Sequence, residues 1–301
     1  MKHLFLLAGL AALGWALAIL PVQADDAESG PTIGLALGSG GAAGLSHIRM
    51  IEAFEEMEIR PDSVAGTSIG AIIGTLYAAG MDSGQMRELF NEFGDSALNP
   101  FANDNGVDIG PTDLLEIDFD TGSVLDPSDF FELVGEHIEA RRFEDLDIPL
   151  KVVATNYWDG ETVVLSEGDL FEALEASMAV PGLVAPVEIG DRLLIDGGTS
   201  NPLPWDQLGE VDIVVAIDVT GTRNPERDGR PNLADLLFKT FEIMQQSLIA
   251  QMRKASSPDI YIKPELSDIR LLHFDRVDEI LEQAEAAADE LREQLGKALE
   301  Q

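Results

Sequence analysis

The chain has 301 residues, with 55 acidic and 19 basic side chains, a formal net charge of −36 at pH 7 and no cysteine. This balance argues against nucleic acid as a partner, which needs clustered Lys and Arg, and the missing cysteines exclude disulfides, thiolate catalysis and cysteine-ligated metals. An acidic surface spread along the whole chain is typical of proteins that work in high salt, where screening removes self-repulsion; an ordinary acidic exported protein is the alternative.

The N-terminus predicts export. A basic start at Lys2 precedes an apolar run over residues 4–20, and a Val-Gln-Ala sequence that ends at Ala24 precedes an acidic pair. Small residues at these places predict a secretory signal peptide over residues 1–24, and hence a periplasmic or secreted protein. An uncleaved membrane anchor is the alternative, because the apolar run is near the lower limit for spanning a bilayer.

The remaining chain is expected to form a short linker over residues 25–31 and one domain over residues 32–301, in which strands alternate with helices. Alternation of this kind predicts an α/β fold with a mostly parallel central sheet and helices on both faces. Strands are expected at 32–38, 63–66, 148–155, 161–165, 192–196 and 212–218, and helices at 43–57, 69–80 and 169–179.

Two turn-rich stretches, at about 95–128 and 220–232, are either lids of a site or passive loops. The C-terminal stretch 274–301 carries apolar residues at helical spacing, which predicts an amphipathic helix packed on the domain rather than a zipper for a partner. These apolar residues are Val277, Ile280, Leu281, Ala284, Ala288, Leu291 and Leu295.

The first candidate for catalysis is Ser68 in the sequence GTSIG. Gly66 and Gly70 flank the serine between an expected strand and an expected helix, where a tight elbow leaves no room for a Cβ atom. The pattern predicts a nucleophilic serine. A helix start capped by Thr67 or Ser68 would explain the same residues without catalysis.

A glycine-rich turn, GSGGAAG, runs from Gly38 to Gly44 between another expected strand and helix. Backbone N–H groups and the helix dipole at such a turn stabilise an anion. A phosphate-binding P-loop is excluded because no Gly-Lys-Ser/Thr follows, and the dinucleotide fingerprint is present only in a shifted form. The oxygen of a tetrahedral intermediate formed at Ser68 is therefore the favoured anion.

The base that would activate Ser68 is open on these patterns. A Ser-Asp-His order could use Asp196 or Asp218 together with His273. His273 lies in RLLHFDR without a glycine or loop signal, which favours a structural role for this histidine.

Asp196 is placed differently, because it ends an expected strand and is followed by Gly197 and Gly198. An aspartate at such a turn often caps the backbone, so this motif alone does not assign a role.

The three motifs together, in this order, resemble the patatin-like phospholipase family. Segments 143–156 and 175–204 are similar to the bacterial branch of that family, and the likeness covers roughly residues 32–220. The resemblance implies an α/β-hydrolase-related fold and a serine acyl hydrolase of the phospholipase A or lysophospholipase type. It also implies a lipid or other ester substrate, no metal or cofactor, and a transient contact with a membrane surface.

The resemblance also assigns roles. Ser68 would be the nucleophile and Asp196 its general base, a dyad without histidine, and burial would have to raise the pKa of the aspartate. The backbone N–H groups of Gly40, Gly41 and Ala42 would form the oxyanion hole. The apolar stretch 176–186 would line the acyl pocket or belong to the core.

One position departs from the family. The glycine loop usually carries Arg or Lys before its last glycine, where this chain has Ala43. Arg49 lies about 240° further around the expected helix and cannot replace that cation. Two readings follow: a weaker enzyme whose acylation rate rises in Ala43→Arg, or a lipid-binding relative without catalysis.

Overall fold

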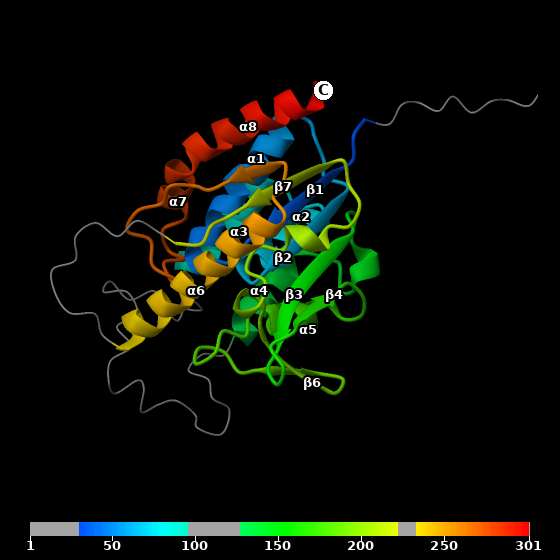
Figure 1. Ribbon diagram of the computed structural model, residues 1–301. Helices are drawn as coiled ribbons and strands as arrows, with labels where there is room; N and C mark the ends of the chain where they lie inside the picture. The colour runs from blue at the N-terminus through cyan, green and yellow to red at the C-terminus, as the bar shows by residue number, and fades with distance from the viewer. Residues whose placement is uncertain (1–29, 96–126, 222–232, 301) are drawn as a thin grey trace, which may run out of the picture. The chain divides into compact units, whose positions relative to one another are not determined.

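An eight-stranded sheet lies at the centre of the molecule, in the order β5-β6-β3-β2-β1-β7-β8 with β4 also paired to β3 (Figure 1). This computed structural model describes residues 30–95, 127–221 and 233–300. The strands are β1 (Ile33–Leu37), β2 (Ser63–Thr67), β3 (Leu150–Asn156), β4 (Thr162–Leu165), β5 (Val187–Ile189), β6 (Arg192–Asp196), β7 (Ile213–Ile217) and β8 (Ile260–Ile262).

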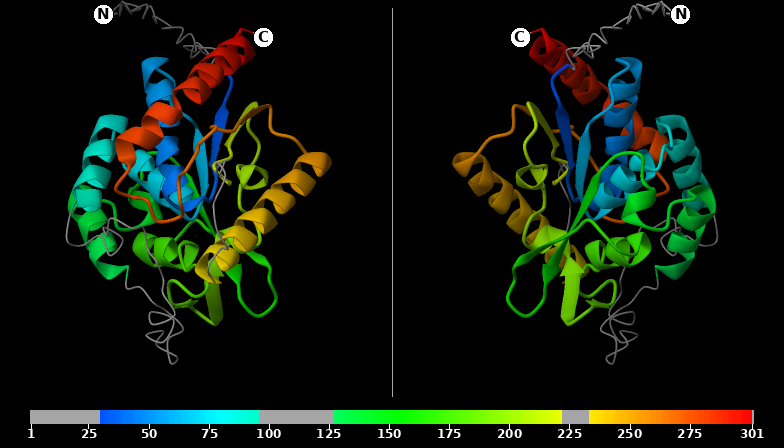
Figure 2. Two further views of the ribbon diagram at one scale, coloured as in Figure 1. Left: turned by 90° about the vertical axis from the view of Figure 1, so that its left-hand side faces the viewer. Right: turned by 90° about the vertical axis from the view of Figure 1, so that its right-hand side faces the viewer.

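Helices cover both faces of this sheet (Figure 2). One face carries most of them, and the other carries the long helix α6 and the short turn η5. The helices are α1 (Ser46–Glu56), α2 (Ile69–Ala78), α3 (Ser83–Asp95), α4 (Ser128–His137), α5 (Leu170–Ser177), α6 (Leu233–Ala255), α7 (Val277–Gln283) and α8 (Glu285–Leu299), with 3₁₀ turns η1 (Gly41–Leu45), η3 (Phe143–Asp145), η4 (Gly197–Thr199) and η5 (Trp205–Gln207).

Side-chain size along the central strands explains the two unequal layers. Leu35 and Leu37 of β1 join the large apolar cluster beneath the main helical layer. Ala36, between them, points to the opposite face and packs in a smaller cluster with Trp205 and Ile249 of α6. Alternate residues of a strand face opposite sides, so the small alanine lets α6 and η5 approach the sheet closely.

The α/β fold predicted from the sequence is confirmed, and all six expected strands are present with small differences at their ends. Strands β1, β2, β3, β7 and β8 are parallel to their neighbours in this set. The sheet is mixed, however, because β6 runs antiparallel to β3 and pairs Asp196 with Ala154. Thr67, at the end of β2, pairs with Val153, so β2 and β6 end at nearly the same level on opposite sides of β3.

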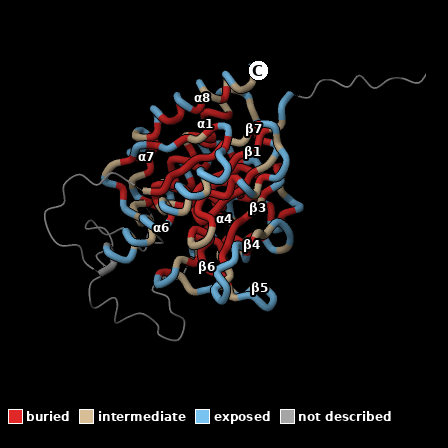
Figure 3. The backbone as a smooth tube through the Cα atoms, in the orientation of Figure 1, coloured by how far each residue is buried: buried red, intermediate tan, exposed pale blue. Residues whose placement is uncertain are grey.

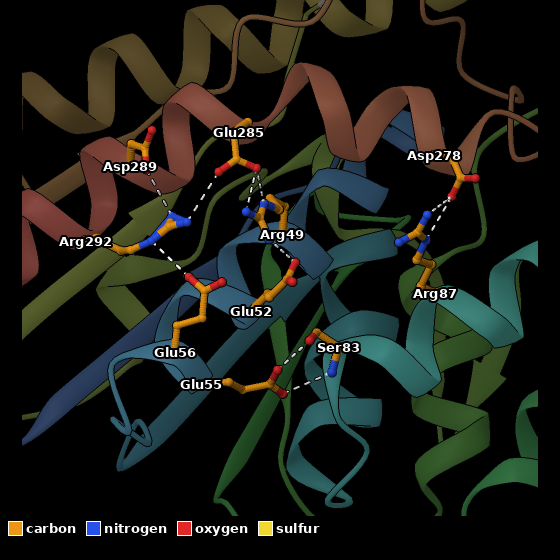
Figure 4. Close-up of polar contacts among 10 residues, drawn as sticks. All are labelled: Arg49, Glu52, Glu55, Glu56, Ser83, Arg87, Asp278, Glu285, Asp289 and Arg292. Carbon is orange, nitrogen blue, oxygen red and sulfur yellow. Dashed lines mark hydrogen bonds and ion pairs between the residues drawn. The ribbon is translucent and has the colours of Figure 1, made fainter.

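The C-terminal stretch packs on the domain as predicted, but it forms two helices, α7 and α8, where the spacing predicted one. All seven apolar residues predicted from their spacing are buried in α7, α8 or the turn between them. Figure 4 shows ion pairs at this contact, in which Arg49 of α1 reaches Glu285 at 2.5 Å and Arg292 of α8 reaches Glu56 at 3.1 Å. Arg87 of α3 holds α7 through Asp278 at 2.8 Å.

The expected signal peptide over 1–24 and most of the two turn-rich stretches lie outside the described residues. Within residues 30–95, 127–221 and 233–300, no helix combines the length and apolar character needed to cross a bilayer.

Candidate active site

Ser68 lies on the turn that joins β2 to α2. Its backbone has φ 55° and ψ −125°, a conformation that residues other than glycine rarely adopt. The residue is 7% exposed. A Cβ atom at Gly66 would lie 2.5 Å from the Gly70 carbonyl oxygen, and one at Gly70 would lie 2.2 Å from the Leu37 carbonyl oxygen. The strained serine thus depends on both flanking glycines, as at a nucleophile elbow.

The backbone of this elbow is held by α5. The Ser68 N–H donates to the Ser177 hydroxyl at 2.9 Å, and that hydroxyl donates to the Val153 carbonyl at 2.6 Å. The segment that follows α5 also anchors the candidate base, since the Asp196 N–H donates to the Ala179 carbonyl at 2.9 Å. The stretch 176–186 therefore positions both candidate residues.

Asp196 is fully buried at the end of β6. Its Oδ1 accepts a hydrogen bond of 2.7 Å from the Gly198 N–H, and its Oδ2 has no hydrogen-bond partner among the described residues. The Ser68 hydroxyl lies close enough to lower the pKa of this carboxyl, although no formed hydrogen bond joins the two groups. Catalytic hydrogen bonds are often long without substrate and shorten in the complex.

Burial is the largest influence on Asp196. It raises the pKa of the carboxyl from 3.8 to about 6, although the Ser68 hydroxyl and the Gly198 N–H both pull the pKa down. A pKa near 6 leaves the group mostly ionised at neutral pH and able to hold a proton briefly, as a general base requires.

The glycine-rich turn is anchored on two sides. The Gly38 N–H donates to the Ile217 carbonyl of β7 at 3.1 Å, and the Ser39 N–H donates to the Pro202 carbonyl at 2.9 Å. Pro202 follows the Asp-Gly-Gly motif, so the turn is tied to the segment that carries Asp196.

Two of the three expected oxyanion donors are unpaired. The N–H groups of Gly40 and Gly41 precede the first internal bond of η1 and have no partner within the described residues. The Ala42 N–H instead donates to the Leu271 carbonyl at 2.8 Å. A Cβ atom at Gly41, whose φ is +57°, would lie 2.4 Å from the same carbonyl oxygen. Gly40 and Gly41 therefore remain as the donors open to a ligand.

His47 of α1 also holds this turn. Its Nε2 donates to the Gly38 carbonyl at 2.8 Å, and its Nδ1 is buried without a partner in the described part of the chain. Burial lowers the pKa of the ring to about 4, so the ring is neutral at pH 7. A neutral histidine in this place positions the backbone of the glycine-rich turn.

Asp218, the second carboxylate that the sequence left open, is saturated. Its Oδ1 accepts from the Thr220 N–H at 2.8 Å and from the Thr220 hydroxyl at 2.6 Å. Its Oδ2 accepts from Lys263 Nζ at 2.8 Å and from the Tyr261 hydroxyl. Both oxygens are occupied, in contrast with Asp196.

His273, the histidine candidate, is engaged elsewhere. Its Nδ1 accepts hydrogen bonds from the Arg270 N–H at 3.2 Å and from Arg276 Nη1 at 3.1 Å. Partial burial and the neighbouring Arg276 lower the pKa of the ring. The basic nitrogen is thus occupied, and no described histidine hydrogen-bonds Ser68 or Asp196.

A comparison with protein-family models identifies the family of this chain. Residues 35–208, more than half of the chain, match the model of the patatin-like phospholipases. The chain belongs to the patatin-like phospholipase family. Ser68, Asp196 and the glycine-rich turn all lie inside the matched region.

Relatives support this membership. An uncharacterized NTE family protein of Mycobacterium tuberculosis is 34% identical over 209 residues, which are 68% of this chain and 54% of that protein. Lysophospholipase NTE1 of Kluyveromyces lactis is 27% identical over 278 residues, 84% of this chain and 18% of that protein. The chain thus spans about half the length of the first relative. Among solved structures, VipD from Legionella pneumophila is similar, with a TM-score of 0.49, 14% identity, and coverage of 88% of this chain and 67% of that one.

Ala43, where the resemblance to the family led us to expect Arg or Lys, is buried. Ala43 is 3% exposed and packs in the main apolar cluster. Arg49, the nearest arginine or lysine that follows in the sequence, is bound to Glu52 and Glu285 (Figure 4). An arginine introduced at residue 43 would have to bury its guanidinium, which opposes any gain in acylation rate. That gain stays a prediction.

Sequence patterns missed several residues of this site. Ser177 lies in a segment similar to the family but carries no catalytic motif. Gln245 of α6 is 4% exposed and its Nε2 donates to the Ser39 hydroxyl at 2.7 Å. A Cβ atom at Gly198 would lie 2.1 Å from Gln245 Nε2. No spacing in the sequence indicates that α6 closes over the Asp-Gly-Gly turn.

Proposed function

We propose that the protein is an exported serine acyl hydrolase that cleaves lipid esters, of the phospholipase A or lysophospholipase type. The observation that carries the proposal is the pairing of Ser68, on a strained elbow, with a buried Asp196 whose Oδ2 is unpaired. Membership in the patatin-like phospholipase family supports a lipid as the substrate.

In the first half-reaction the Ser68 oxygen attacks the ester carbonyl carbon while its proton passes to Asp196 Oδ2. The carbonyl oxygen becomes an anion and accepts hydrogen bonds from the N–H groups of Gly40 and Gly41. The intermediate then collapses. The bond to the leaving oxygen breaks, the alcohol takes the proton from Asp196, and an acyl ester of Ser68 remains.

In the second half-reaction water attacks the acyl carbon. Asp196 takes a proton from the water, the bond to the Ser68 oxygen breaks, and the serine regains a proton as the fatty acid leaves. One carboxylate thus serves both halves, and its pKa of about 6 suits this exchange near neutral pH.

A fluorophosphonate probe tests the dyad directly. We expect the wild type to be labelled, Ser68→Ala to be inert, and Asp196→Asn to be labelled about 10²–10⁴-fold more slowly. His273→Ala is the matched control and should retain the wild-type rate. The reaction is run in low and high salt because the chain carries a net charge of −36.

Loss of labelling in His273→Ala together with normal labelling in Asp196→Asn would replace the dyad with a Ser-His-Asp triad. A folded wild type that is not labelled at any salt concentration would indicate a lipid-binding relative without catalysis.

Export is tested separately. Expression of the full chain in a bacterial host, followed by fractionation and N-terminal sequencing, should give a periplasmic or secreted protein that begins directly after Ala24. A membrane-bound product that retains residues 1–24 would instead mean an uncleaved anchor.

A further inference from the structure

Large hydrophobic side chains are rarely exposed in this protein. Six of them are more than half exposed in the described part of the chain, and they lie in two groups that are far apart in the sequence. They are Tyr157 and Trp158 after β3, and Leu236, Leu237, Ile243 and Met244 on α6.

The first group lies beyond the sheet edge that carries the active site. Strands β2 and β3 are parallel, and Thr67 pairs with Val153. Ser68 follows β2 directly, whereas β3 continues past that level before Tyr157 and Trp158. The two rings meet edge to face at 4.9 Å, and their exposed fractions are 54% and 75%.

The second group lies at the same edge. Gln245 of α6 contacts Ser39, which follows the carboxyl end of β1. Four residues later, Ile249 packs in one cluster with Ala36, inside β1. The helix therefore runs from the carboxyl edge toward the middle of the sheet, and the residues before Gln245 extend beyond that edge. Figure 3 colours much of this half of α6 as exposed.

One side of this half-helix carries no charged residue, although the exposed Lys239 borders it. At 100° per residue its side chains fall within an arc of about 160°. We name this set the α6 outer face: Leu236, Leu237, Thr240, Phe241, Ile243, Met244 and Ser247. The ion pair between Lys239 and Glu242 lies outside the arc.

Another surface helix of the same chain provides the comparison. The exposed positions of α8 include Glu285, Asp289, Glu290 and Glu293, as the acidic composition leads one to expect. The α6 outer face departs from this pattern next to the candidate dyad, and contiguous exposed apolar surface of this kind marks an interaction site.

We propose that the α6 outer face and the Tyr157–Trp158 pair dock the protein on the surface of a zwitterionic lipid assembly. The proposal rests on the proposed function, since the docked edge is the one that carries Ser68. Aliphatic side chains would enter the acyl region while the aromatic pair lies at the headgroup level. The exposed Asp159 and Glu161 beside that pair, and the net charge of −36, disfavour an anionic membrane.

Docking through α6 would bring lipid close to the candidate dyad. Gln245, on the inner side of α6, holds Ser39 of the glycine-rich turn, and its amide lies against Gly198 beside Asp196. One helix therefore offers an apolar face to the lipid and a polar contact to the dyad.

Tryptophan fluorescence provides the test, in a Ser68→Ala background that does not consume the vesicles. The third tryptophan, Trp15, is replaced by phenylalanine in every sample; of the other two, Trp158 is exposed and Trp205 is buried. Phosphatidylcholine vesicles should shift the emission to shorter wavelength, and Trp158→Phe should abolish this shift. Vesicle flotation measures the affinity independently.

Leu237→Glu and Met244→Glu should each raise the dissociation constant at least about tenfold, because each replaces buried apolar area with a charge at the lipid contact. Ala286→Glu is the matched control, since it adds the same charge at an exposed position of α8 and should leave the affinity unchanged. Circular dichroism verifies that each variant is folded.

Three results would overturn the docking proposal: no spectral shift with phosphatidylcholine, equal affinity in Leu237→Glu and Met244→Glu, or tighter binding to phosphatidylglycerol vesicles. A dimer in solution that Leu237→Glu dissociates would assign the face to a second copy of the chain and also overturn it. Binding in the Ser68→Ala background does not depend on catalysis, so absent fluorophosphonate labelling with intact docking would refute only the proposed function.

Discussion

Replacing the candidate base, Asp196, should stabilise the protein while it slows the reaction. Asp196 is fully buried with Oδ2 unpaired, and folding raises its pKa from 3.8 to about 6. The folded state therefore binds this proton more tightly than the unfolded state. The contribution to stability is present in full below pH 3.8 and is lost as the pH rises through about 6. Asp196→Asn, which is neutral at every pH, avoids this loss.

The size of the effect follows from the two pKa values. A separation from 3.8 to about 6 corresponds to about 3 kcal/mol over the full titration. The protein has an isoelectric point near 4.1, so measurements are best kept above pH 5. Between pH 5 and pH 8 the linkage relation gives a change of about 1.4 kcal/mol. The unfolding free energy of Asp196→Asn should rise by this amount relative to that of the wild type.

Urea unfolding at constant ionic strength measures this difference at pH 5, 6, 7 and 8. The comparison between pH values removes any fixed contribution from the altered amide contacts. Asp191→Asn, at an exposed position of the neighbouring turn, is the control and should show a constant difference from the wild type. A constant difference for Asp196→Asn as well would refute the conclusion that this carboxylate is held ionised in a desolvated site.

Three further predictions concern activity. The wild-type kcat/KM should fall about tenfold per pH unit below pH 6, as Asp196 is protonated, and stay level above pH 7; a profile without this limb would remove the base. Ser177→Ala leaves the buried Ser68 N–H unpaired, so we expect a loss of about 1–3 kcal/mol in unfolding free energy and a slower acylation rate in stopped-flow assays. Gly198→Ala should lower kcat, because its Cβ would meet Gln245, and adding Gln245→Ala should restore part of the rate; no restoration would place the clash elsewhere.

The parts of the site that sequence patterns predicted are those whose constraints are local. The elbow at Ser68 requires glycine two residues away on each side, and the structure supplies a close contact at both positions. The strand order and the antiparallel direction of β6 arise only from pairing in the sheet. For that reason the sequence placed Asp196 at a strand end without showing that this end lies across β3 from the end of β2.

Long-range partners could not be predicted at all. The Asp-Gly-Gly sequence is sufficient to predict a turn at Gly198. The atom nearest to a Cβ at Gly198, however, belongs to Gln245 of α6, which no local pattern indicates. Likewise the Ala42 N–H is satisfied by Leu271, a residue with no motif around it. Such contacts depend on how distant elements fold over the site, and a single sequence carries no record of that packing.

The anchoring of the glycine-rich turn bears on the cation that the resemblance to the family led us to expect at residue 43. Neutral groups hold the turn in place: the His47 ring at the Gly38 carbonyl, the Ser39 N–H at the chain after the Asp-Gly-Gly motif, and the Leu271 carbonyl at the far end. A cation at residue 43 is therefore not required to fix the backbone donors, and its absence removes only an electrostatic contribution to the oxyanion. The glycine-rich turn with Ala43 is therefore compatible with catalysis, and the acylation rate should depend on the geometry of its backbone N–H donors more than on charge.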